Sequence, residues 1–388
     1  MRYVWIASAV VGLAIVGVVC LKALSGPLNA DFTMFWKLHE LAYPPPYLLF
    51  IKAFTLLPYG AAFILWVGLT GALYVFASRE AKLPALGNPA AAFNGMIGQN
   101  GFLTGAIMFA GLQRLAVKPW QGGAILGLLI IKPHLAIILP FAVVAGRAWL
   151  AVPAALGSMA LLLLLSFAVF GADAYLQFFE LSAKYGSYVR EGAWDWNELA
   201  SFYALSRWAG LPTVLAWIIH GTLAMGAATA VWFAWREDWK EKIALTSAAA
   251  LLMSPYLFTY DAVLLTLALA CLHWRGALAV VALLLLPLAR VFSHQDWPNT
   301  VPLAAALAVC LIARASWSRR SWSPTTTCAE CLSPLERRDR HTRRVPARND
   351  KTRYEHPCSR RLEHRRGEAR PLIRAWLTDR LDAQRIQA

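Results

Sequence analysis

The sequence YVWIASAVVGLAIVGVVCLKAL, residues 3–24, contains a single charged side chain, that of Lys22. A helix of this length is long enough to cross the roughly 30 Å hydrocarbon core of a bilayer. The run is long for a signal peptide and lacks a clear small-x-small cleavage site, so we interpret it as a retained membrane span. This stretch decides the class of fold that the rest of the chain must share.

Similar apolar runs recur along the chain, and only 15% of its 388 residues are charged, where a soluble domain averages about 25%. Long runs lie near 58–78, 100–117, 149–170, 211–235, 277–294 and 299–314, and shorter ones near 83–97, 120–131, 134–147, 243–260 and 262–273. We therefore predict an all-α fold, a polytopic transmembrane helical bundle of roughly 9–12 membrane segments that include short broken helices.

The last part of the sequence has a different composition. Residues 315–388 are rich in Arg, and apolar periodicity is nearly lost there. Such a segment is typical of disordered chain that contacts anionic lipid headgroups. We predict two regions, a transmembrane domain at 1–314 and a disordered cytoplasmic tail at 315–388.

Lys and Arg residues are concentrated in alternate loops, as the positive-inside rule requires of a membrane protein. The loops assigned to the cytoplasm contain Arg79, Lys82, Arg114, Lys118, Arg147, Arg236, Lys240, Lys242 and Arg275. The same alternation places five polar segments together on the outer face: Asp31, residues 94–100, Lys132 to His134, the loop 171–210 and residues 293–296. We predict a multi-pass protein of the cell membrane (inner or plasma membrane).

The first of these outer segments is Asp31-Phe32-Thr33-Met34-Phe35-Trp36, which closes at Tyr43-Pro44-Pro45-Pro46. Consecutive prolines fix φ and favour extended chain, so we expect a rigid turn back into the membrane. Asp31 would then be an acid at the edge of the bilayer. The alternative is an ordinary interfacial loop with a solvated Asp beside an aromatic belt.

Two further segments interrupt apolar sequence with polar side chains. Gly98-Gln99-Asn100-Gly101 predicts a sharp turn, either a plain connection or a backbone that approaches a ligand closely. The stretch 119–147 reads as two short helices, which either cross a thinned bilayer or form a hairpin that penetrates and returns. Either arrangement places Lys132-Pro133-His134 at the outer end, where Lys132 could bind phosphate or extend toward lipid headgroups.

The outer loop 171–210 is rich in aromatic residues, and 174–185 has the spacing of an amphipathic surface helix. Trp194-Asp195-Trp196-Asn197-Glu198 combines aromatic faces with polar groups, which suits either a sugar or an interfacial belt. Pro255 breaks a later apolar stretch before Asp261. That carboxylate could serve the site as a second acid, or it could cap a helix beginning at Ala262.

Motifs for nucleotide-driven transport and soluble enzymes are missing from the sequence. We find no P-loop, GxGxxG, GxSxG or HExxH pattern, and no nucleic-acid-binding module. Cys328-x-x-Cys331 with Cys358 lacks clean zinc-knuckle spacing. We therefore expect no cofactor, no metal and no nucleic-acid partner.

The ordered set Asp31-Phe32-x-x-Phe35-Trp36, Tyr43 to Pro46, Gly98 to Gly101, Lys132 to Leu135 and Ser254 to Asp261 resembles glycosyltransferase family 87. These are polyprenol-phosphate-mannose-dependent α-(1→2)-mannosyltransferase-like membrane proteins, and the likeness covers about residues 1–310. The resemblance implies the GT-C architecture, an extracytoplasmic active site and a lipid-linked sugar donor. It also implies an acidic base in the first outer loop, which here is Asp31.

From this resemblance we expect inverting transfer of a sugar, mannose in the family, from a polyprenyl-phosphate donor to a glycan or glycolipid acceptor. Asp31 would be the catalytic base, and the phosphate of the donor would be bound by Lys132 and His134. The expected substrate-binding residues are Gln99, Asn100, Tyr256, Asp261, Trp194 and Trp196.

Two departures from the family leave other functions open. The segment between Trp36 and Tyr43 is shorter than the outer segment of the family, and the Arg-rich tail stands where final spans would be expected. The alternatives are a non-enzymatic transporter or flippase of lipid-linked sugars and a degenerate, inactive family member.

Overall fold

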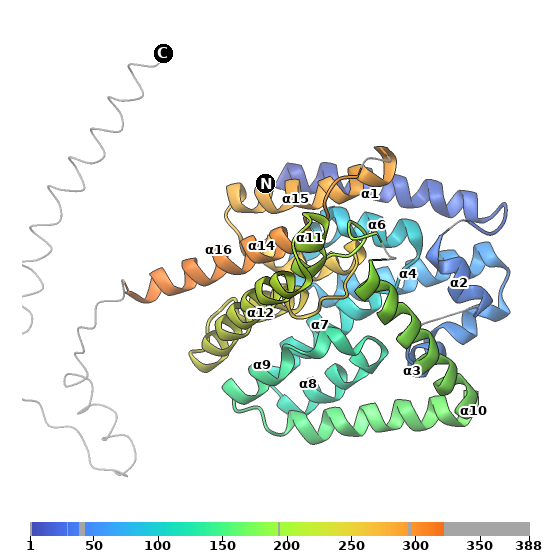
Figure 1. Ribbon diagram of the computed structural model, residues 1–388, viewed down its shortest axis with the longest axis horizontal. Helices are drawn as coiled ribbons and strands as arrows, with labels where there is room; N and C mark the ends of the chain where they lie inside the picture. Colours follow the sequence, from blue (N-terminus) through green and yellow to red (C-terminus); the bar gives the residue numbers. More distant parts are fainter. Residues whose placement is uncertain (1, 29, 39–42, 193–194, 294–295, 322–388) are drawn as a thin grey trace, which may run out of the picture. The chain divides into compact units, whose positions relative to one another are not determined.

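The computed structural model describes residues 2–28, 30–38, 43–192, 195–293 and 296–321. Throughout this part of the chain the regular elements are helices (Figure 1), apart from one isolated antiparallel bridge between Leu199 and Phe258. Within these described ranges, five helices are long and apolar enough to cross a membrane: α1 (Arg2–Ala23), α4 (Tyr59–Ala77), α10 (Ala151–Glu191), α12 (Thr213–Arg236) and α16 (Val301–Ser321). The all-α polytopic fold is thus confirmed.

The other helices, with the exception of α15, are shorter, and several join end to end into broken apolar segments. They are α2 (Asp31–Lys37), α3 (Pro45–Lys52), η1 (Ala53–Leu56), η2 (Arg79–Ala81), α5 (Lys82–Gly87), α6 (Pro89–Ile97), α7 (Gly101–Leu115), α8 (Pro119–Leu126), η3 (Gly127–Ile131), η4 (Pro133–Ala136), α9 (Leu139–Ala145), α11 (Phe202–Trp208), α13 (Lys242–Met253), η5 (Thr259–Leu265), α14 (Thr266–Cys271) and α15 (Trp274–Ser293). Most of the predicted domain 1–314 is therefore described, whereas most of the expected tail lies outside the described residues.

Helices α1 and α6 pack side by side through small residues. A Cβ added at Gly12 would lie 3.2 Å from that of Ala92, and one added at Gly95 would lie 2.9 Å from a methyl of Val16. Small residues permit such close approach between membrane helices. Because the paired residue numbers increase together, the two helices run in the same direction. The end of α6 therefore lies beside the end of α1, next to the start of α2.

The segment between α7 and α10 is broken at the predicted position. η3 ends at Ile131, η4 begins at Pro133, and Lys132 between them has non-helical angles (φ −150°, ψ 68°). Proline disfavours helical geometry at the residue before it, which accounts for the break. Lys132 therefore lies at the junction of two short apolar helices.

Two local expectations are corrected by the structure. Pro44 is extended (φ −55°, ψ 139°), but Pro45 and Pro46 form the first turn of α3 and do not continue the extended chain. The first helical turn tolerates proline because its N–H groups need no intrahelical partner. In the expected loop 171–210, the helix predicted at 174–185 is present, but it is part of α10, which continues to Glu191 beyond a single non-helical residue, Gly171 (φ 70°, ψ −174°).

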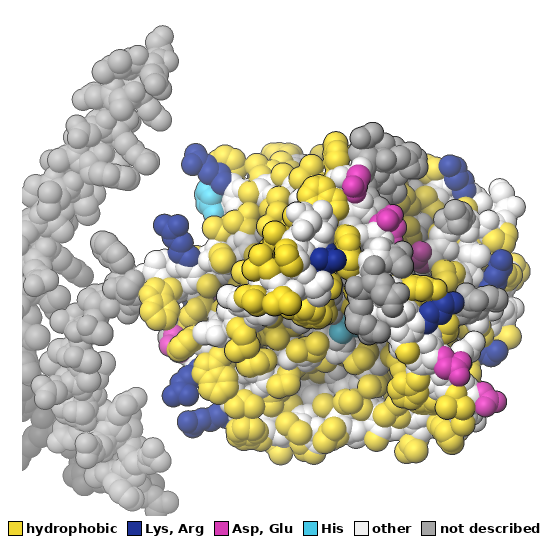
Figure 2. Space-filling view, viewed as in Figure 1, with side chains coloured by type: hydrophobic (Ala, Val, Ile, Leu, Met, Phe, Trp, Pro, Cys, Tyr) yellow, Lys and Arg dark blue, Asp and Glu magenta, His cyan; other side chains and the backbone are white. Residues whose placement is uncertain are grey.

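Apolar side chains cover much of the middle of the visible face, and Lys and Arg lie mainly along its left and right edges (Figure 2). Large hydrophobic residues are exposed on α1 and on the first part of α10, among them Val10, Leu13, Leu161, Leu164 and Phe167. Exposed large apolar side chains of this kind mark membrane-facing regions. Charged ends and an apolar middle are the pattern of a membrane-spanning bundle.

Candidate active site

Asp31 is the first residue of α2 and is half-buried. The aromatic residues beside it are part of the protein core and not a lipid-facing belt. Phe32 is fully buried and meets Phe63 edge to face at 5.4 Å, and Phe35 meets Tyr47 at 5.3 Å. Edge-to-face pairs of this kind add to the free energy of apolar burial. α2 is thus anchored by its aromatic side chains, and this anchoring fixes the position of the carboxyl group.

The carboxylate of Asp31 is held by the turn that follows α6. Gln99 Nε2 donates a hydrogen bond to Asp31 Oδ2 at 2.8 Å. The other end of the same amide, Gln99 Oε1, accepts hydrogen bonds from Tyr43 Oη at 3.2 Å and from the backbone N–H of Asn100 at 3.0 Å. Asp31 and Tyr43, which lie 68 and 56 positions away in the sequence, are therefore both bound to the amide of this turn.

The geometry of this turn depends on Gly98. Its φ of 67° lies in the left-handed region, and an added Cβ would lie 2.7 Å from Phe32 Cβ. The carbonyl of Gly98 accepts a hydrogen bond from Trp66 Nε1 at 3.0 Å. The glycine is needed because protein, and not a ligand, comes close to the backbone here.

Lys132 and Asp261 form a buried ion pair beside this turn. Lys132 Nζ donates to Asp261 Oδ1 at 2.5 Å and to Asn100 Oδ1 at 3.3 Å, and it lies 4.5 Å from the ring centroid of Tyr260. The two charged side chains are 4% and 0% exposed. Such a pair neutralises two charges that could not be buried singly.

The sequence left two roles open for Asp261, and the structure shows capping together with the ion pair. Asp261 Oδ2 accepts a hydrogen bond from the backbone N–H of Phe258 at 3.2 Å, within the first turn of η5, which begins at Thr259. The expected helix start at Ala262 is therefore wrong by three residues. Sequence reasoning missed the partnership of Lys132 with Asp261, because nothing in either local pattern points to the other.

His134 and Tyr256 lie near each other, with ring centroids 6.4 Å apart in an edge-to-face arrangement. His134 Nε2 is buried, and no described residue forms a hydrogen bond with it. Asn100 Nδ2 is in the same situation. Buried polar atoms are normally paired, so these two atoms are candidates for contact with a bound molecule.

Trp196 is built into a different set of contacts. Its ring meets that of Tyr203 at 5.9 Å, and the guanidinium carbon of Arg207 lies 5.4 Å from its centroid. Trp194 lies outside the described residues. The loop nevertheless lies beside the segment that contains Asp261, because the backbone N–H of Ala200 donates to Leu257 O at 2.7 Å.

The electrostatic environment of Asp31 has contributions of both signs. Burial is the largest effect and raises the pKa of Asp31 above its usual value, and the nearby carboxylate of Glu198 adds to the rise. The hydrogen bond from Gln99 and the charge of Lys132 lower the pKa and partly offset it. A carboxyl group shifted in this way is a better proton acceptor than an ordinary aspartate.

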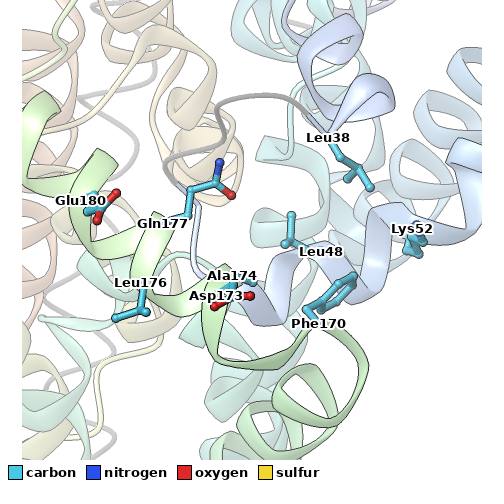
Figure 3. Close-up of a pocket in the computed structure, with 9 residues that line it drawn as sticks. All are labelled: Leu38, Leu48, Lys52, Phe170, Asp173, Ala174, Leu176, Gln177 and Glu180. Atoms are coloured by element: carbon cyan, nitrogen blue, oxygen red, sulfur yellow. The ribbon is translucent and has the colours of Figure 1, made fainter.

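A separate pocket of about 570 Å³ lies where α2 and α3 face the second part of α10 (Figure 3). It is lined by Leu38, Leu48, Lys52, Phe170, Asp173, Ala174, Leu176, Gln177 and Glu180. None of the expected site residues lines this pocket. The described residues contain no group of three or more His, Cys, Asp or Glu side chains placed to hold a metal ion.

Fold and site together define a multi-pass helical membrane protein with a carboxylate, an amide and a lysine gathered at one end of its short broken helices. Residues 41–255 match the model of glycosyltransferase family 87, and the chain belongs to this family of glycosyltransferases. The matched region includes Gln99, Asn100, Lys132 and His134, while Asp31 lies before it and Asp261 after it. Comparison with curated proteins and with solved structures gives no significant match.

Proposed function

We propose that this glycosyltransferase moves a sugar from a polyprenyl-phosphate donor to a hydroxyl of a glycan or glycolipid acceptor. Asp31 takes the proton of the acceptor hydroxyl as the new bond to the anomeric carbon forms. The bond between that carbon and the phosphate oxygen breaks, and polyprenyl phosphate leaves with the bonding electrons. A single displacement inverts the anomeric configuration, and mannose is the sugar that we assign.

The observation that carries the proposal is the environment of the Asp31 carboxylate, namely its hydrogen bonding and its partial burial. One of its oxygens is held by Gln99, while no described residue donates a hydrogen bond to the other. The side chain is half-buried and its pKa is raised by that burial. A general base needs an oriented oxygen, a route for substrate and a pKa closer to the working pH, and this carboxyl group combines them.

Positive charge for the leaving phosphate would come from Lys132, with His134 beside it. Asp261 and Asn100 hold the ammonium group of Lys132 in place, so it needs no reorganisation when charge develops on the phosphate. His134 Nε2 has no described hydrogen-bond partner and could donate to a phosphate oxygen. Asn100, Tyr256 and Asp261 would complete the binding site, and Trp194 and Trp196 would contact sugar from the outer loop.

The proposed site faces the extracytoplasmic side of the cell membrane. The support is the distribution of Lys and Arg, which assigns the opposite loops to the cytoplasm. The contacts among Asp31, Gln99, Lys132 and Asp261 are consistent with this topology, since they require their segments to meet at one level of the bundle.

The test is transfer by membranes that contain the protein, with labelled polyprenyl-phosphate-mannose as donor and extracted glycolipid as acceptor. We expect new glycosidic label with the wild type and none with Asp31→Asn. Asp238→Asn is the matched control, because that carboxylate is 84% exposed in the turn between α12 and α13. Full transfer by Asp31→Asn would refute the proposal.

The same membranes distinguish the alternatives. Movement of labelled donor across the bilayer without a new glycosidic bond would indicate a flippase. Neither transfer nor movement, from protein that is folded and inserted, would indicate an inactive family member.

A further inference from the structure

Gln99 uses both ends of its side-chain amide within the protein. Nε2 donates to Asp31 at 2.8 Å, and Oε1 accepts from Tyr43 and from the backbone N–H of Asn100. The side chain is 5% exposed. We infer that Gln99 is a positioning residue that orients the carboxylate of Asp31, and that Tyr43 and the Asn100 backbone fix the orientation of its amide. This inference rests on the proposed function and replaces the substrate contact expected from the sequence.

The hydrogen-bond pattern admits one orientation of the amide. The oxygen and nitrogen of a glutamine side chain are assigned from their partners. The backbone N–H of Asn100 can only donate, so the atom facing it must be the oxygen Oε1. The atom facing Asp31 is then Nε2, which can donate to a carboxylate. A rotated amide would set N–H against N–H and oxygen against carboxylate.

The surrounding fold fixes where this amide lies. Gly98 precedes Gln99 and packs directly on Phe32, the residue after Asp31. Tyr43 Oη also lies 3.5 Å from Tyr260 Oη, and Tyr260 packs against Lys132. The amide thus connects the carboxylate of Asp31 to the segment that holds the Lys132–Asp261 pair.

A donor at this position also favours the ionised form of Asp31. The charged groups that act on Asp31 are Glu198, which raises its pKa, and Lys132, which lowers it. The phenols of Tyr43, Tyr47 and Tyr260 also interact with it. Removing the hydrogen bond from Gln99 withdraws one of the two effects that stabilise the carboxylate.

The test compares pH profiles of kcat and KM for transfer by the purified full-length protein in nanodiscs, with labelled polyprenyl-phosphate-mannose. Gln99→Met keeps the size of the side chain but removes the donor. We expect its acidic limb to move up by about one pH unit and kcat to fall about tenfold, with the KM for the donor unchanged. Tyr43→Phe should shift the limb in the same direction by less.

Two further variants keep the test decisive. Gln99→Glu retains an acceptor for Tyr43 and Asn100 but places a second carboxylate beside Asp31, so its acidic limb should move further than that of Gln99→Met. Gln113→Met is the control, because Gln113 Nε2 donates to Ala77 O away from the site. Its pH profile should match that of the wild type.

A higher KM with an unmoved acidic limb in both Gln99 variants would overturn the inference and indicate substrate binding. An equal loss of kcat at every pH would overturn it in favour of a purely structural role. The proposed function fails on a different result, namely transfer by Asp31→Asn. The two failures are therefore distinguishable.

Discussion

Lys132 Nζ lies 2.5 Å from Asp261 Oδ1, although the two residues are 129 positions apart in the sequence and both side chains are buried. Breaking such a pair leaves one uncompensated charge in the interior. Lys132→Met should therefore reduce the free energy of unfolding by about 3–5 kcal/mol, while the double variant Lys132→Met/Asp261→Asn should recover most of that loss. Chemical unfolding in detergent measures both values.

The same double variant separates folding from chemistry. If Lys132 stabilises the leaving phosphate, the double variant should fold and still lose transfer. A single Lys132→Met variant as stable as the wild type would contradict the buried ion pair.

Asp31 should destabilise the protein at neutral pH. Because its pKa is raised on folding, the folded state binds the proton more tightly than the unfolded chain, whose pKa is about 3.9. The contribution of Asp31 to the free energy of unfolding therefore falls as the pH rises from the pKa of the unfolded chain through the higher pKa of the folded protein. We expect Asp31→Asn to gain melting temperature relative to the wild type, by more at pH 7 than at pH 4.

Melting curves of Asp238→Asn correct this comparison for the general loss of a carboxylate. A wild type that is more stable than Asp31→Asn at pH 7, by more than at pH 4, would show that the folded state lowers the pKa of Asp31.

Gly98 should not tolerate a side chain. Its positive φ and the 2.7 Å between an added Cβ and Phe32 predict that Gly98→Ala loses about 1–3 kcal/mol of stability and displaces Asp31 from Gln99. Gly68 on α4 is the matched control, since an added Cβ meets nothing within 4 Å. Gly68→Ala should be neutral or slightly stabilising. Equal effects of the two substitutions on melting temperature would contradict the packing of this turn.

The orientation in the membrane can be tested with single cysteines in a chain whose own cysteines are replaced by alanine. Lys37→Cys lies at the exposed end of α2, and Lys240→Cys lies in the turn between α12 and α13. A membrane-impermeant maleimide applied to intact cells should label the first and reach the second only after permeabilisation. The reverse pattern would place Asp31 on the cytoplasmic side.

Much of the fold could be predicted because a membrane span is recognised from a continuous run of apolar residues, without knowledge of the rest of the chain. Apolar runs mark α1, α4, α12 and α16, and the Lys132-Pro133 break was visible because proline restricts the residue before it. The second part of α10 was less visible. The spacing at 174–185 predicted a helix there, and the structure has one, but its continuation to Glu191 and the turn at Gly171, which depends on one backbone conformation, were not predicted.

The sequence could indicate candidate site residues but not the contacts among them. The positive-inside rule grouped Asp31, the Gln99 turn and Lys132 on one face, and their contacts agree with that grouping. The pairing of Lys132 with Asp261 and the use of both ends of the Gln99 amide are long-range contacts, which depend on tertiary packing. Tyr43 was seen only as the start of a proline turn, although it completes the hydrogen bonds around Gln99.

The central claim is that Asp31 performs chemistry and is not needed for folding or donor binding. The most direct measurement is donor binding and single-turnover transfer by purified Asp31→Asn protein in nanodiscs, with labelled polyprenyl-phosphate-mannose and acceptor. We predict wild-type affinity for the donor and no transferred sugar. Transfer at the wild-type rate would contradict the account.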